Sequence, residues 1–193
     1  NIGDKGSSKP RPRYVITPLE GLRAAVPQAC EVTYNNGSVI KKAADIARKA
    51  DIAVIIVGYT YRDEGEYMLT RGGDREILTL KPHDESLILQ TVAANPNTVV
   101  VLMGGSAIIT EAWREKVPAL LMAWYPGMEG GNALADILLG KVNLCAKLPC
   151  VFPKSEGQLP FFDKRAKSIE YGYFHGYRLI DRQGQRPAFP FGF

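Results

Sequence analysis

The sequence has few of the residues that build metal centres and disulfide frameworks. It contains two histidines and three cysteines, Cys30, Cys145 and Cys150. An odd number of cysteines argues against a complete disulfide framework, and no Cys-x-x-Cys spacing indicates a zinc site. Cys145 and Cys150 are near enough along the chain to pair, but free thiols packed as small apolar groups are the favoured alternative. We therefore predict no metal site.

Long hydrophobic runs and long runs of one charge are also missing. No apolar run reaches the roughly 20 residues that a membrane span needs, and the polar first ten residues do not resemble a signal peptide. Lys and Arg are scattered and the net charge is +4, which does not favour a nucleic-acid-binding surface. With 46% hydrophobic and 23% charged residues, the composition is that of an ordinary globular domain with a core.

Both ends of the sequence suggest a piece of a longer polypeptide. The chain begins at Asn1 without an initiator methionine and ends in an aromatic-rich stretch, residues 187–193. We expect a single domain over residues 1–193, excised from a longer protein, in which residues 154–193 form a loop-rich tail.

Apolar runs alternate with amphipathic segments along the chain. The capping-box pattern from Thr17 to Glu20 predicts one helix start, and Pro82 predicts another. The expected strands cover residues 31–34, 52–57, 98–103, 119–124 and, at an edge, 147–152; the expected helices cover 18–25, 39–50, 82–94, 106–113 and 132–139. This alternation predicts an α/β fold, a three-layer α/β/α sandwich with helices on both faces of a mostly parallel sheet of about five to six strands.

An acidic segment follows the strand predicted to end near Gly58. Asp63, Glu64 and Glu66 come directly after it, where open α/β sheets bind their ligands. Crowding of three carboxylates favours the protonated form of one of them, and a general acid needs that form. The alternative is a structural role, in which these carboxylates are solvated or pair with nearby arginines (Arg62, Arg71 and Arg75).

Three further motifs have two interpretations each. The glycine-rich turn at residues 127–131 lacks the Gly-x-Gly-x-x-Gly spacing of a dinucleotide site, so a packing turn is favoured over an anion or sugar site. Ser106 lacks the Gly-x-Ser-x-Gly elbow of a nucleophile, so we expect it to cap a helix. Trp124 and Tyr125, at the end of a predicted strand, either stack on a sugar ring or are buried under a neighbouring loop.

Motifs in a fixed order resemble the second domain of glycoside hydrolase family 3, the β-glucosidase family. They cover nearly the whole chain and include residues 3–8, 15–21, 63–66, 73–75, 95–102, 123–131, 133–136, 140–143, 147–149, 171–173, 176–178 and 190–192. Two places depart from the family pattern, because residues 144–146 replace a usual Pro-Ser-Gly and Cys150 replaces an apolar residue.

The resemblance implies the acid/base domain of a retaining, exo-acting β-glycosidase of the β-glucosidase type. In that family an N-terminal barrel supplies the aspartate nucleophile, and many members add a fibronectin-III-like domain after the sandwich. The resemblance places the general acid/base on Glu66, with Glu64 as the alternate. It implies no cofactor and a β-linked oligosaccharide or glycoside as substrate. It leaves the location open but favours a periplasmic or secreted protein over a cytoplasmic one.

Other expectations concern the same segment and the chain as a whole. We expect Tyr59, Tyr61 and Asp63 to contact the substrate, and we expect the chain to be inactive without the barrel. The competing hypothesis is a non-catalytic α/β module that binds carbohydrate or a partner protein, with Tyr59, Tyr61, Trp124 and Tyr125 as stacking residues. A nucleotide-binding domain is a third, less favoured hypothesis.

Overall fold

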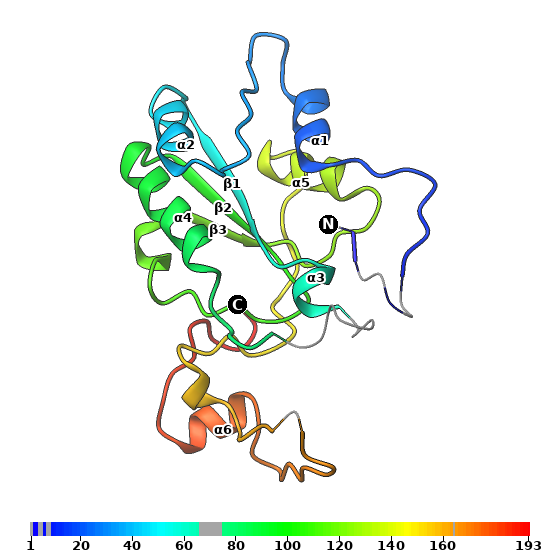
Figure 1. The fold of residues 1–193 in the computed structure, drawn as a ribbon, viewed down its shortest axis with the longest axis vertical. Helices are drawn as coiled ribbons and strands as arrows, with labels where there is room; N and C mark the ends of the chain where they lie inside the picture. Colours follow the sequence, from blue (N-terminus) through cyan, green and yellow to red (C-terminus); the bar gives the residue numbers. More distant parts are fainter. Residues whose placement is uncertain (1, 4–5, 7–8, 66–74, 164) are drawn as a thin grey trace.

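The computed structural model describes residues 2–3, 6, 9–65, 75–163 and 165–193. Its centre is a parallel sheet of β1, β2 and β3 (Figure 1). The elements, in chain order, are α1 (Pro18–Ala25), α2 (Ile40–Ala47), β1 (Ala53–Gly58), α3 (Tyr61–Glu64), α4 (Pro82–Ala94), β2 (Thr98–Met103), η1 (Arg114–Lys116), β3 (Ala119–Met122), α5 (Gly130–Leu138), η2 (Glu156–Gln158) and α6 (Tyr177–Arg182).

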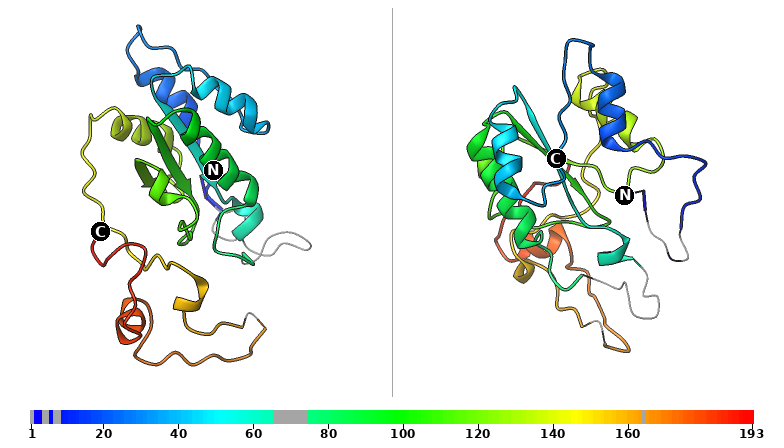
Figure 2. Two further views of the ribbon diagram at one scale, coloured as in Figure 1. Left: turned by 90° about the vertical axis from the view of Figure 1, so that its left-hand side faces the viewer. Right: turned by 45° about the horizontal axis from the view of Figure 1, so that its top comes forward.

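The sheet has the order β1-β2-β3, and both strand pairs are parallel. Helices α2 and α4 pack against each other beside β1 and β2, whereas α1 and α5 pair on the other side of the sheet (Figure 2). The core lies between α4 and the sheet, where Ile88 and Val100 are fully buried and Trp113 is almost so. Because all three strands are parallel, their carboxyl ends meet at one edge, where α3 begins.

The predicted α/β architecture is confirmed, but the sheet in the described part of the chain has three strands instead of five or six. Residues 31–34 and 147–152, expected as strands, lie outside every strand. Residue types that favour strands do not supply a partner, and without a paired neighbour no ladder forms. The expected helix over 106–113 is also wrong, because the Ile109 amide donates to the Leu78 carbonyl (2.8 Å) and Thr79 bridges Ile109 in parallel.

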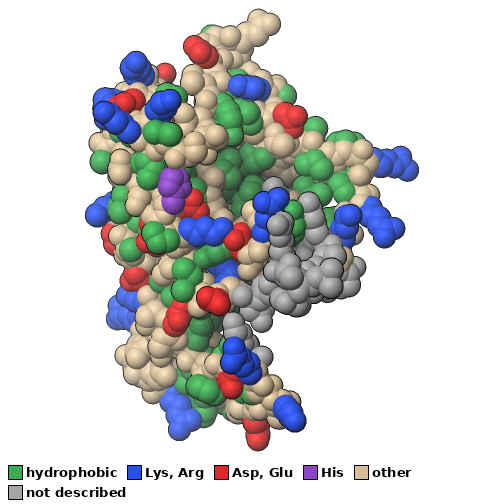
Figure 3. Space-filling view, in the orientation of Figure 1, with side chains coloured by type: hydrophobic (Ala, Val, Ile, Leu, Met, Phe, Trp, Pro, Cys, Tyr) green, Lys and Arg blue, Asp and Glu red, His purple; other side chains and the backbone are tan. Residues whose placement is uncertain are grey.

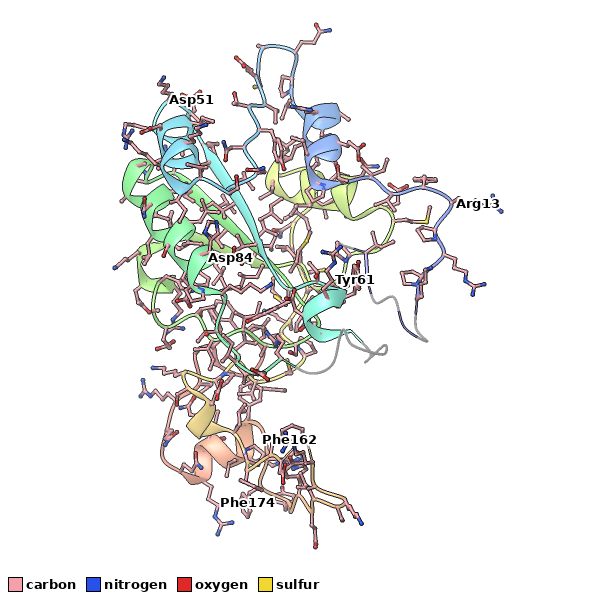
Figure 4. The ribbon with its side chains drawn as sticks, viewed as in Figure 1. Arg13, Asp51, Tyr61, Asp84, Phe162 and Phe174 are labelled. Carbon is pink, nitrogen blue, oxygen red and sulfur yellow. The ribbon has the colours of Figure 1, made fainter. Side chains whose placement is uncertain are left out.

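Among the described residues of the range 154–193, η2 and α6 are the regular elements. Figure 1 shows this tail below the sheet. Several contacts join it to the rest of the domain. Among them, Arg114 donates to the Ala188 carbonyl, the Leu78 amide donates to Glu156 (3.1 Å) and the Ala188 amide donates to the Phe152 carbonyl (2.9 Å). Ile180 in the tail is fully buried. Its surface is rich in exposed aromatic side chains, among them Phe161, Phe162, Tyr173 and Phe174. Phe162 and Phe174 are labelled in Figure 4.

None of the helices in the described part of the chain combines the length and the apolar character needed to cross a membrane.

Helices α1 and α5 approach each other through two glycines. A Cβ atom on Gly21 would lie 2.1 Å from the Gly131 carbonyl oxygen, and one on Gly131 would lie 2.1 Å from the Thr17 carbonyl oxygen. The Gly131 amide also donates to the Ile16 carbonyl (3.0 Å). The glycine-rich turn thus opens α5 and allows close contact with α1, whereas the packing interpretation of this motif expected close contact of the helix with the sheet.

We expect Gly131→Ala to lower the free energy of unfolding by about 2 kcal/mol or more, because backbone atoms must move to admit the methyl group. Gly172→Ala is the matched control, since a Cβ there meets nothing within 4 Å. Urea unfolding of the two variants checks the prediction, and equal midpoints would contradict it.

Candidate active site

Helix α3 carries the acidic residues that follow β1. Thr60 and Asp63 form a capping box at its start: the Asp63 carboxylate accepts hydrogen bonds from the Thr60 amide (2.9 Å) and from the Thr60 hydroxyl (3.1 Å). This Thr-x-x-Asp spacing satisfies amides that a helix start leaves without partners. The turn therefore has a fixed start at the carboxyl end of β1, and Glu64 is its last residue.

Glu64 joins the loops that follow all three strands. Its Oε1 atom accepts hydrogen bonds from the amide of Gly105, beyond β2, and from the hydroxyl of Tyr125, beyond β3. Its Oε2 atom lies 3.1 Å from Nε of Arg75, and the side chains of Glu64 and Arg75 are only 9% and 4% exposed. Both carboxylate oxygens therefore have hydrogen-bond or ion-pair donors, and one of these donors, Arg75, is cationic.

Arg75 is fixed on two further sides. Its Nη2 atom donates to the Ser106 hydroxyl and to the Ala107 carbonyl (2.8 Å). Its guanidinium lies over the ring of Tyr59, 4.3 Å from the ring centroid. Ser106 therefore accepts a hydrogen bond from Arg75 and begins no helix, so its predicted role as a cap is wrong.

Asp63 faces Lys81, whose Nζ lies 2.5 Å from Oδ1. Burial alone would raise the pKa of the Asp63 carboxyl, but the hydrogen bonds from Lys81 and Thr60 outweigh it and hold this pKa below its usual value. An acid with a lowered pKa in the folded state stabilises the fold above its unfolded pKa, and this contribution disappears as the pH falls.

We expect Asp63→Asn to cost about 1 kcal/mol of unfolding free energy at pH 7, through loss of the cap and the ion pair. The difference from the parent chain should shrink as the pH falls below about 4, the ordinary aspartate pKa. Urea unfolding from pH 7 to pH 3 measures it. Asp45→Asn removes an exposed ion pair with Arg48 and serves as the control with a smaller effect; an undiminished Asp63→Asn cost at pH 3 would contradict the prediction.

The two tyrosines of this segment have different surroundings. Tyr59 is 4% exposed, and its hydroxyl donates to the Thr79 carbonyl; burial raises the pKa of this phenol. Tyr61 begins α3 (Figure 4) and is partly buried, with its hydroxyl accepting from Nε of Arg62 (3.2 Å). Substrate contact by Tyr59, Tyr61 or Asp63 stays a prediction.

Glu66, the predicted general acid/base, lies outside the described residues, as does Arg71. Glu66 follows Gly65, which ends α3, so it comes two positions after the buried carboxylate of Glu64. Of the predicted arginine partners, Arg75 pairs with Glu64.

Trp124 and Tyr125, which follow β3, both contact other side chains of the domain. Trp124 has a positive φ of 53°, an uncommon conformation for a residue other than glycine. Its ring packs edge to face on Phe152, with centroids 6.1 Å apart. Tyr125 then follows with its hydroxyl on Glu64.

The convergence of Gly105 and Tyr125 on Glu64 is what sequence reasoning missed. The signal was present, because both residues follow the ends of predicted parallel strands and such ends share one edge of a sheet. Gly105 and Tyr125 are 41 and 61 positions away from Glu64 along the chain. Which of the loops after the strands lie next to each other depends on the order of the strands in the sheet, and the spacing of motifs does not reveal that order.

No group of three or more potential metal ligands occurs among the described residues.

All three cysteines are free, but Cys30 and Cys145 are exposed. The prediction that the free thiols pack as small apolar groups is therefore wrong for these two. Basic and acidic side chains lie interspersed on the face that Figure 3 shows, in keeping with the mild net charge.

Comparison with known proteins gives one consistent result. A 160-residue stretch is 39% identical to "Probable beta-glucosidase I" of Neosartorya fischeri, covering 80% of this chain and 18% of that protein. Two solved β-glucosidases have the same fold. The one from Kluyveromyces marxianus, in complex with glucose, is 34% identical with a TM-score of 0.71 and covers 84% of this chain and 20% of its own. The one from Bifidobacterium adolescentis is 29% identical with a TM-score of 0.82 and covers 97% and 29%.

The chain thus spans about a fifth of the length of the curated relatives that it matches. The model of the glycosyl hydrolase family 3 C-terminal domain matches residues 1–193. The chain therefore belongs to glycosyl hydrolase family 3, of which it represents the C-terminal domain.

Proposed function

We propose that this chain is the acid/base-bearing domain of a retaining, exo-acting β-glycosidase that removes terminal β-linked glucosyl residues from oligosaccharides. The observation that carries the proposal is the anchored acidic turn α3 at the carboxyl edge of the sheet, in a chain whose relatives are β-glucosidases. This edge is where open α/β sheets bind ligands.

Glu66 is the proposed proton donor, and the contacts of Glu64 support that choice. A general acid must be protonated for part of each cycle and must reach the oxygen of the leaving group. Glu64 is buried, and Arg75, Tyr125 and Gly105 occupy its two oxygens. The oxygens of Glu64 thus already have partners within this chain, whereas Glu66 is the next carboxylate along the sequence.

A retaining mechanism also needs a second carboxylate, which acts as the nucleophile. In retaining glycosidases a nucleophile attacks the anomeric carbon while the acid protonates the glycosidic oxygen, and the two carboxyl groups lie about 5–5.5 Å apart. The acid then acts as the base that activates water. We propose that an aspartate from an N-terminal barrel of the same enzyme is this nucleophile, so that the catalytic centre lies between two domains.

The stereochemistry of the first product tests the proposal. In the complete enzyme, proton NMR during hydrolysis of p-nitrophenyl β-glucoside should show β-glucose first, with α-glucose appearing only by later mutarotation. The α-glucoside is the control and should be turned over far more slowly. Release of α-glucose as the first product would indicate inversion and would overturn the proposed mechanism.

A further inference from the structure

Strand β1 has β2 on one side and, in the described part of the chain, no strand on the other. The Ala53 amide donates to the carbonyl of Asn97, directly before β2 (3.0 Å). In a parallel pair only alternate residues of a strand bond to the same neighbour. Val54 and Ile56 therefore direct their backbone amides and carbonyls away from β2, to the side that we call the open edge of β1.

The sequence of β1 does not protect this open edge. Residues Ala53–Gly58 include no charged residue and no proline, the residues with which natural edge strands avoid pairing. Ile52, directly before β1, is 64% exposed and Ile56 is 36% exposed, although strands of parallel sheets are ordinarily buried on both faces. Figure 3 shows hydrophobic side chains at the surface between the sheet and the pair of α1 and α5. β1 thus has the composition of an interior strand at the position of an edge strand.

The other edge strand, β3, offers less to a partner. It has four residues, whereas β1 has six, and a short edge is one of the ways in which sheets avoid further pairing. Of the two edges, the one at β1 is therefore the better candidate for an interaction surface.

We propose that an extended apolar segment of about five or six residues, from the part of the same polypeptide outside these 193 residues, pairs with the open edge of β1. Its backbone bonds to Val54 and Ile56, and its side chains cover Ile52 and Ile56. Main-chain pairing with an exposed sheet edge is a general way of binding an extended segment. This inference goes beyond the proposed function and does not depend on it, because it concerns the sheet and not the acid/base.

The length of the relatives favours a segment of the same polypeptide over a separate partner. The chain covers 18% of the Neosartorya fischeri protein and 29% of the Bifidobacterium adolescentis structure, so most of such a polypeptide lies outside this domain. A separate peptide of about six residues would lose its translational and rotational freedom on binding. A tethered segment has an effective concentration in the millimolar range and loses less.

Hydrogen exchange resolved to single amides tests the proposal in the complete enzyme. The amides of Val54 and Ile56 should exchange within about tenfold of the rates of Ile55 and Val57, the matched controls whose amides face β2. Exchange of Val54 and Ile56 more than about tenfold faster than the controls would show that the edge is open and would overturn the proposal. This comparison needs only the complete enzyme, so it stays decisive if the isolated chain does not fold.

The isolated 193-residue chain provides a second comparison. There, Val54 and Ile56 should exchange at least about 100-fold faster than in the complete enzyme, whereas Ile55 and Val57 should remain slow because β2 is present. Equal protection of Val54 and Ile56 in both proteins would show that these 193 residues cover the edge themselves, which would overturn the proposal.

A photo-crosslinker identifies the segment. In the complete enzyme, Ile56→p-benzoylphenylalanine should form a crosslink within one molecule, and mass spectrometry should place it on a segment outside residues 1–193. The same replacement at Tyr173, an exposed residue of the tail, is the control and should not reach that segment. A crosslink to residues 1–193, or a product with the mass of two molecules, would show a different occupant and overturn the proposal. Neither measurement reads catalysis, so its failure would leave the proposed function unaffected.

Discussion

Glu66→Ala in the complete enzyme should lower kcat on cellobiose by about 10²- to 10⁴-fold, the usual contribution of a positioned acid or base. The leaving group of cellobiose is a sugar hydroxyl, which departs as an unstable alkoxide unless it is protonated. We do not expect the neighbouring Glu64 to replace the missing acid, because its oxygens already have Arg75, Tyr125 and Gly105 as partners.

The same variant should behave differently with an activated substrate. 2,4-Dinitrophenyl β-glucoside should still form the glycosyl-enzyme, which then accumulates because no base activates water. A burst of dinitrophenolate followed by slow turnover would reveal it. Azide needs no base, so its addition should speed turnover and yield β-glucosyl azide, in which the retained configuration shows that the nucleophile is intact.

Glu170→Ala, a change at an exposed glutamate in the tail, is the control for both measurements and should match the parent enzyme. Full activity of Glu66→Ala on cellobiose would show that the acid/base is elsewhere, and Glu64→Ala would then be the next variant to measure.

Patterns within a few consecutive residues correctly predicted several helix starts and one strand. The capping box from Thr17 to Glu20 was predicted and is present at the start of α1. Strand β2 was predicted with its observed bounds, since a short run rich in β-branched apolar residues between Asn97 and Gly104 is typical of a strand buried on both faces. The helix that begins at Pro82 also starts where it was expected.

Elements that depend on distant partners were predicted less well. Residues 31–34 and 147–152 have strand-like composition but form no ladder in the described structure, because composition does not specify a neighbour. Residues 106–113 have apolar positions spaced for a helix, yet Ile109 pairs with the backbone at Leu78 and Thr79. The same limit applies to the site: clustering of Asp63, Glu64 and Glu66 was evident, whereas the separation of an anchoring Glu64 from the others required knowledge of strand order.

The 193-residue chain by itself should hydrolyse no β-glucoside, with kcat/KM at least about 10⁴-fold below that of the complete enzyme. Retention requires two carboxyl groups on opposite sides of one anomeric carbon. Of the described carboxylates on α3, Asp63 is held by Lys81 and Thr60, and Glu64 by Arg75 and Tyr125. Neither is available as a nucleophile.

Binding by the isolated chain distinguishes the two functions that its sequence left open. Half of a shared site offers few contacts to a sugar, so glucose and cellobiose should bind with a Kd in the millimolar range or weaker. Calorimetric titration measures this, and circular dichroism with urea unfolding shows whether the chain is folded under the same conditions. Micromolar binding without turnover would favour a carbohydrate-binding module, and turnover by the isolated chain would place both catalytic carboxylates within these 193 residues.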